Sequence, residues 1–232
     1  MMISLQTVYN LLLKHYGPQG WWPLATQANQ PGFDERGYHQ GDYTHPKTPQ
    51  QQFEVCLGAI LAQNTSWKNV EKVMHNLQKH HLLARKVILE IPEKRLAQLI
   101  RSAGYFNQKA KKLKAFAQFK GPITRENLLA IWGIGKETAD SVLCYAYHQP
   151  IFVVDAYTQR IFHRLGFSEQ GYDAIQQRVM HKWTDEKTLH EFHALLVELG
   201  KNICTPTPRC DQCPLKKVCQ KRGIQKEAIR SS

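Results

Sequence analysis

A glycine-rich turn between two apolar segments carries the first residues that could do chemistry. Gly133 and Gly135 stand one residue apart, and a helix is predicted to begin directly after them at Lys136. Glycine accepts positive φ and lets another backbone approach closely. A helix start presents unpaired backbone N–H groups, which suit a phosphate oxygen when a lysine stands beside them. Taken alone, such a turn more often only connects two helices.

A carboxylate follows this turn at a defined place. Pro150 leads into the apolar run 151–154, and Asp155 stands where the next helix, residues 156–165, is predicted to begin. Aspartate at that place is first of all an N-cap. A carboxylate can also stabilise the positive charge that develops on a sugar ring when a glycosidic bond breaks. The residues alone leave both interpretations open.

Four of the six cysteines are crowded near the C-terminus. Their gaps are five, two and five residues, and they are Cys204, Cys210, Cys213 and Cys219. In a chain without a secretory signal, such crowding favours metal ligation over disulfides. Four thiolates at compact spacing suit a metal centre, but the spacing does not choose zinc over an iron–sulfur cluster.

The charge balance restricts the kind of partner. Lysine and arginine number 31 against 19 acidic residues, a formal net charge of +12, which favours nucleic acid or an anionic membrane surface. No run reaches the ~18 apolar residues of a membrane span. The N-terminal apolar stretch has no basic segment before it and no small-residue cleavage site, unlike a signal peptide. We therefore expect a cytoplasmic monomer without a membrane partner, associated with the nucleoid if the source is bacterial.

Helical periodicity dominates the chain, and strand-like alternation is confined to short apolar runs, so the fold class is predicted to be all-α. The predicted helices are residues 5–15, 51–63, 67–79, 92–103, 108–119, 128–132, 136–147, 156–165, 172–183 and 185–203. Residues 17–49 have no periodicity and form a loop too long to be a mere connector. The adjacent Trp21 and Trp22 lie in this loop, where tryptophans are more often packing anchors than a binding site.

Residues 128–166 resemble the helix-hairpin-helix and Gly/Pro…Asp signature of the DNA glycosylase superfamily that includes endonuclease III. The matching residues are Gly133, Gly135, Thr138, Ala139, Pro150, Val154, Asp155 and Arg160. The resemblance implies a two-lobed helix-hairpin-helix fold that binds double-stranded DNA containing a damaged base. We expect a central lobe at about residues 50–165, with the hairpin at 128–147. Residues 1–49 and 166–203 would form the second lobe, followed by a metal loop at 204–219.

Residues 59–67, together with the paired tryptophans, are similar to the 3-methyladenine glycosylase III branch of this superfamily. This similarity implies a base pocket formed by Trp21, Trp22 and Trp67. It also implies that Gln63 enters the gap left by the extruded base. The chain differs from the branch in a longer segment between the two landmarks, roughly residues 24–51.

The resemblance assigns roles to further residues. Tyr105, in the turn after Gly104, matches the position that wedges the duplex open, and Gly133, Gly135 and Lys136 match the phosphate-binding hairpin. Asp155 matches the catalytic carboxylate. The lysines of residues 108–119 form either a solvated face or a phosphate contact.

The same resemblance selects iron–sulfur chemistry for the cysteine loop. The family closes its C-terminus with a similar loop around a [4Fe–4S] cluster, although its usual first gap is one residue longer. The four cysteines would then be the ligands, and the role would be structural. A basic loop containing Arg209, Lys216 and Lys217 would be held in shape against DNA.

The sequence therefore predicts a monofunctional glycosylase that removes alkylated purines such as 3-methyladenine from duplex DNA. One alternative is an endonuclease III-like glycosylase and lyase for oxidised pyrimidines. That activity requires a lysine nucleophile, and the family's nucleophile position falls on Glu137 in this chain. Another alternative is a non-catalytic DNA-binding protein, since a hairpin and basic charge need only phosphates.

Overall fold

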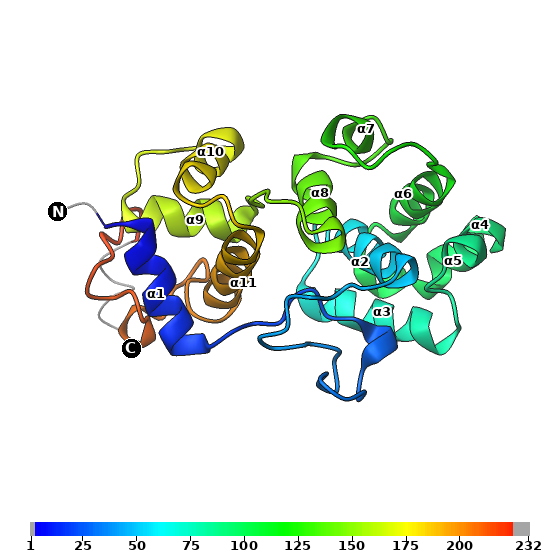
Figure 1. Ribbon diagram of the computed structural model, residues 1–232, viewed down its shortest axis with the longest axis horizontal. Coiled ribbons are helices and arrows are strands. Elements are labelled where there is room, and N and C mark those ends of the chain that lie inside the picture. Colours follow the sequence, from blue (N-terminus) through cyan, green and yellow to red (C-terminus); the bar gives the residue numbers. More distant parts are fainter. Residues whose placement is uncertain (1–2, 225–232) are drawn as a thin grey trace. The chain divides into compact units, whose positions relative to one another are not determined.

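The computed structural model describes residues 3–224 of the chain, and their regular structure is helical with no strand, as predicted (Figure 1). The chain divides into two compact units. Unit 1 consists of residues 1–19 and 150–232, and unit 2 of residues 20–149. Within the described part, none of the helices is long and apolar enough to cross a membrane.

The unit boundaries differ from the predicted ones at 49–50 and 165–166. The loop after residue 20 belongs to unit 2 because Trp21 and Trp22 pack against Trp67 and Tyr145 of that unit. Helix α9 (Ala156–Leu165) belongs to unit 1 because it packs against α11 (Glu186–Asn202). Long-range packing decides both boundaries, and sequence composition gave no sign of it.

Unit 2 is built around one buried helix. Helix α2 (Pro49–Leu61) has residues 53–61 all buried, and a helix that is apolar on every side must lie inside its domain. It contacts α3, α6, α8 and the π-helical turn η3. The other elements of the unit are η1 (Ala25–Gln27), α3 (Trp67–Lys79), α4 (Arg85–Glu90), α5 (Glu93–Leu99), η2 (Arg101–Ala103), α6 (Phe106–Gln118), α7 (Arg125–Leu129), α8 (Lys136–Ser141) and η3 (Val142–Ala146).

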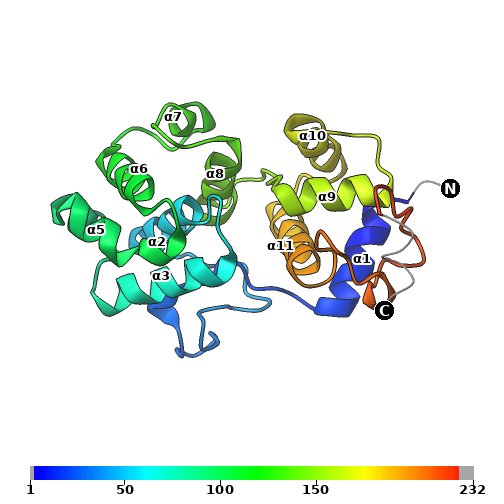
Figure 2. The same cartoon turned by 180° about the vertical axis from the view of Figure 1, so that it is seen from behind.

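Unit 1 is arranged around α11, which contacts α1 (Leu5–Tyr16) on one side and α9 on another (Figure 2). Helix α10 (Tyr172–Lys182) packs against α9. The core contains residues from all four helices and from the run 151–154, including Leu12, Phe152, Phe162 and Phe192. The chain then enters the cysteine loop, whose only regular element among the described residues is η4 (Cys210–Gln212).

Three local expectations need correction. Helix α4 was not predicted, because its six residues are too few to show a period. The helix predicted at 92–103 is interrupted at Ile100, which separates α5 from η2. Helix α7 begins at Arg125 and not at 128, because the Thr124 hydroxyl accepts a hydrogen bond from the Asn127 N–H and caps the helix there.

Candidate DNA-binding surface and active site

The hairpin has the geometry that its glycines predict. Gly133 has φ +83°, and a Cβ at that position would lie within 3 Å of the Lys112 side chain, so glycine is required. Gly135 is the N-cap of α8, and Lys136 is exposed in the first turn. Arg125 makes a two-pronged ion pair with the fully buried Asp140, with Nε–Oδ1 at 2.7 Å and Nη2–Oδ2 at 3.0 Å. This pair fastens α7 to α8 and therefore fixes the hairpin.

Gln63 is bound to the hairpin. Its amide nitrogen donates to the Gly133 carbonyl (3.1 Å) and to the Thr138 hydroxyl (2.8 Å), and its amide oxygen accepts from Lys112 Nζ (2.5 Å). The predicted insertion of Gln63 into the gap left by an extruded base would have to break these bonds. The structure thus gives Gln63 a second role, which is to join the end of α2 to the hairpin.

Two exposed aromatic side chains border a recess of about 350 Å³ next to Gln63. Tyr105 is 70 % exposed, and its left-handed backbone (φ +45°) at the start of α6 turns the chain sharply. Trp132, immediately before the hairpin glycine, is 56 % exposed. Lys109 and Lys112 line the same recess. Exposed aromatic rings beside lysines suit unstacked bases and phosphates, and of these two rings only Tyr105 was predicted from the sequence.

Lys109, one of the two lysines that line this recess, has a structural role. Lys109 is 2 % exposed and donates to the carbonyls of Leu61 and Ala103, both at 2.8 Å. Burial, together with the nearby charge of Lys112, lowers the pKa of Lys109 to about 8. The ammonium group caps the end of α2, so Lys109 neither faces solvent nor is free to contact a phosphate.

The three predicted pocket tryptophans lie together. The Trp67 ring centroid is 4.7 Å from that of Trp21 and 5.1 Å from that of Trp22, although they are far apart in sequence. Trp21 and Trp22 are each 4 % exposed, while Trp67 is partly exposed at the start of α3. Tyr145 in η3 completes the cluster at 5.3 Å from Trp22 and was not predicted. Of the three tryptophans, Trp67 is therefore the most exposed to solvent.

A glycine makes this cluster possible. Trp22 lies directly on α2 at Gly58, where a Cβ would come within 2.7 Å of the indole Nε1. Any larger residue at 58 would push the ring out of its place. The apolar helix of the sequence therefore contains one position whose identity is fixed by a loop residue.

Asp155 is the N-cap of α9 and also lies next to the buried His193. Its Oδ1 accepts from the Thr158 N–H at 2.7 Å, and its Oδ2 lies 3.8 Å from Nε2 of the buried His193 on α11. Burial acts to raise the pKa of Asp155, but the interaction with the nearby His193 and the hydrogen bond from the Thr158 N–H outweigh it and lower the pKa. The carboxylate is consequently ionised at neutral pH. Nothing in the sequence pointed to His193, because only the packing of α11 against α9 brings it there.

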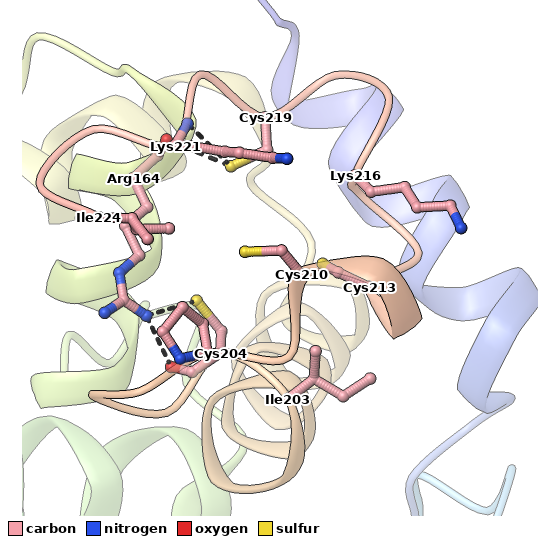
Figure 3. A pocket seen from close by; sticks show the side chains of 10 residues that line it. Arg164, Ile203, Cys204, Cys210, Cys213, Lys216, Cys219, Lys221 and Ile224 are labelled. Carbon is pink, nitrogen blue, oxygen red and sulfur yellow. Dashed lines mark hydrogen bonds between the residues drawn. The ribbon is translucent and has the colours of Figure 1, made fainter. Parts of the chain in front are cut away.

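The four predicted ligand cysteines line one cavity (Figure 3). Donors reach two of the sulfurs: Arg164 Nη1 lies 3.3 Å from Cys204 Sγ, and the Lys221 N–H lies 3.4 Å from Cys219 Sγ. Burial raises the pKa of Cys213 to about 11. Across residues 3–224, no three His, Cys, Asp or Glu side chains are grouped as the ligands of a single metal ion. The four thiols and the Arg164 side chain thus lie around one small cavity of the loop.

Arg164 holds the start of this loop in place. The guanidinium is buried and donates to the carbonyls of Cys204 (3.3 Å), Thr205 (2.6 Å) and Pro206 (3.0 Å). Arg160, one turn earlier on α9, donates to the Cys204 carbonyl (2.8 Å). The helix that Asp155 caps therefore also positions the first cysteine. Arg160 was noted from its motif, whereas Arg164 was missed.

Comparison with known proteins gives the family. The HhH-GPD superfamily of base excision DNA repair proteins matches residues 57–185. A protein of Methanocaldococcus jannaschii, provisionally named a DNA repair glycosylase, is 39 % identical over 231 residues and covers 91 % of this chain and 94 % of its own.

Solved structures agree with this relationship. The H. pylori 3-methyladenine DNA glycosylase bound to 1,N6-ethenoadenine superposes with a TM-score of 0.62 at 28 % identity, covering 85 % of this chain and 95 % of that one. An endonuclease III–DNA complex superposes with a TM-score of 0.72 at 21 % identity over 95 % and 97 % of the chains, which shows a shared fold. This chain belongs to the HhH-GPD superfamily of base excision DNA repair proteins and is a DNA glycosylase.

Proposed function

We propose that this DNA glycosylase excises alkylated purines such as 3-methyladenine from duplex DNA and releases the base by hydrolysis alone. The observation that carries the proposal is the tryptophan cluster around Trp67. The 28 % identity to a glycosylase named for 3-methyladenine supports the same substrate class.

The chemistry of the lesion fits an aromatic pocket. Purines alkylated on a ring nitrogen are cationic, so their glycosidic bond is already weak and no strong general acid is needed. A cation above an indole ring gains roughly 0.5–2 kcal/mol. Trp67 would stack on the extruded base and so favour a charged lesion over the neutral bases of undamaged DNA, with Trp21 and Trp22 behind it.

Asp155 would act on the sugar. Departure of the base leaves an oxocarbenium-like species at C1′, and an ionised carboxylate stabilises that charge and helps orient the attacking water. The lowered pKa of Asp155 keeps it ionised for this task, the Thr158 N–H holds one of its oxygens, and His193 lies 3.8 Å from the other. Damaged double-stranded DNA would be bound by the hairpin, by Tyr105 and by Trp132.

The cysteine loop fits a [4Fe–4S] cluster with Cys204, Cys210, Cys213 and Cys219 as ligands. Four thiols line one cavity and two of the sulfurs receive N–H donors, which suits thiolate ligation, and the resemblance to the endonuclease III family favours the cluster over zinc. When bound, the cluster would supply structural cross-linking of the loop. Anaerobically purified protein should contain iron and acid-labile sulfide, whereas stoichiometric zinc without sulfide would contradict this assignment.

The test of the proposed function is a base-excision screen on duplexes that carry single lesions. We expect release of 3-methyladenine by the wild type and no release from an oxidised pyrimidine, with the Asp155→Asn protein as the control for contaminating enzymes. Trp67→Ala should lower excision of the alkylated base more than it lowers affinity for undamaged duplex, since the ring acts on the extruded base and phosphates supply non-specific affinity. Efficient release of oxidised pyrimidines instead would favour the endonuclease III-like alternative.

A further inference from the structure

The indole N–H of Trp67 is directed at an anionic hydrogen-bonded pair. Trp67 Nε1 donates to the Tyr38 hydroxyl at 2.7 Å and to Glu71 Oε1 at 3.1 Å, and the Tyr38 hydroxyl itself lies 3.2 Å from the same Glu71 oxygen. Glu71 is one helical turn after Trp67 on α3, which places both side chains on one face. The N–H edge of the Trp67 ring is thus fixed by two residues that lie outside the motifs of the sequence.

Glu71 supplies a negative charge in this arrangement, and Arg36 supplies an exposed positive charge beside it. Burial and the neighbouring Glu71 raise the pKa of Tyr38, so the phenol remains a neutral donor and Glu71 supplies the charge. Arg36 Nη1 lies 3.9 Å from Glu71 Oε1, but the Arg36 side chain is 54 % exposed, so water weakens that pair. The carboxylate is 19 % exposed and therefore acts on the indole through a medium less polar than water.

The long segment after Trp22 delivers Tyr38 to this position. The Asp34 carboxylate accepts the N–H groups of Arg36 and Tyr38, both at 2.8 Å, and Leu24 N–H donates to the Gly37 carbonyl at 2.9 Å. Gly37 has φ +88°, and a Cβ there would lie 2.2 Å from the Leu24 carbonyl oxygen. These contacts close a tight loop against the chain near Trp22 and leave Tyr38 buried beside Trp67.

We propose that Glu71, held with Tyr38 at the N–H edge of Trp67, is a specificity-determining positioning group. It makes this pocket prefer positively charged bases over neutral ones. A carboxylate that accepts the indole N–H increases the electron density of the ring, and its negative potential attracts a cation stacked on that ring. A neutral base gains neither effect. The inference rests on the proposed function and assigns a task to the segment at residues 24–51, which is to place the Tyr38 hydroxyl between Trp67 and Glu71.

The experiment compares two lesions in one enzyme preparation. Single-turnover excision is measured for 3-methyladenine, which is cationic in DNA, and for 1,N6-ethenoadenine, which is neutral, after subtraction of spontaneous depurination. We expect Glu71→Gln to reduce excision of the cationic base about tenfold, in line with the strength of a cation–π contact, while excision of the neutral base changes less than about twofold. Tyr38→Phe keeps the ring but removes the hydroxyl and should give a smaller change in the same direction.

Controls separate charge from folding. Glu93→Gln removes the same charge from an exposed site on α5 and should leave the ratio of the two excision rates unchanged. A Glu71→Gln protein that loses both activities in parallel would show that Glu71 only supports the fold, and the inference would be wrong. Glu71→Asp retains the charge and should retain most of the preference. A wild type that excises neither lesion would instead contradict the proposed function, because the inference concerns only the ratio.

Discussion

At the scale of single residues, Asp155 combines structural and chemical roles that one substitution can separate. Asparagine caps helices as well as aspartate does, so Asp155→Asn should retain the Thr158 N–H bond and lose only the stability that the ionised carboxylate contributes beside His193. Excision should nevertheless fall by at least a hundredfold, because the lost charge acts in the transition state. Duplex affinity should stay within about threefold of wild type. Single-turnover kinetics and a binding titration measure the two effects, and near-wild-type excision would rule out this role for Asp155.

Glu54 gives a prediction about pH. It is fully buried in α2 and accepts from the Thr26 N–H (3.2 Å) and hydroxyl (2.6 Å), and burial raises its pKa from 4.5 to about 7. Between those pH values the unfolded chain has released this proton and the folded chain retains it, so the free energy of unfolding falls as pH rises. Glu54→Gln should therefore raise the melting temperature by a few degrees at pH 8 and change it little at pH 4. A larger gain at pH 4 than at pH 8 would contradict the assignment.

At the scale of elements, we expect the first turn of α8 to determine whether the enzyme can cleave the DNA strand. By the resemblance, the position that matches the family's lysine nucleophile carries Glu137, which cannot form an imine, and the neighbouring Lys136 points about 100° away around the helix. Borohydride should trap little covalent enzyme–DNA complex during excision, and abasic sites should remain intact. Glu137→Lys tests which residue of this turn faces the sugar. A gain of covalent trapping in that variant would show that position 137 faces C1′. Efficient trapping by the wild type that disappears in Lys136→Ala would show that Lys136, and not position 137, faces C1′.

At the scale of the whole molecule, the excess of positive charge should appear as a salt dependence. Each phosphate that the protein neutralises makes the slope of log affinity against log salt concentration more negative by about 0.9. Lys136→Ala should make the slope for undamaged duplex less steep by about one unit. Lys86→Ala is the matched control, since that side chain is 84 % exposed and pairs with Glu90 on α4. Titrations at several salt concentrations give both slopes, and an unchanged slope for Lys136→Ala would remove it from the phosphate contacts.

The sequence by itself determined the features that depend on local pattern. Helical periodicity gave the all-α class, and the spacing of Gly133, Gly135 and Asp155 identified the hairpin and the capped helix. The membership in a glycosylase superfamily followed from these same short motifs. Such features can be read from a chain because turn conformation, capping and amphipathic period depend on residues within one or two turns of each other.

Only the tertiary structure decided which distant side chains meet. His193 reaches Asp155 because α11 packs on α9, and Tyr38 reaches Trp67 because a glycine-containing loop folds back on Leu24. Gln63 was predicted to enter DNA, and only the fold shows its amide bound to the hairpin. No local pattern encodes these pairs, because each is set by the packing of segments at least 29 residues apart in the chain.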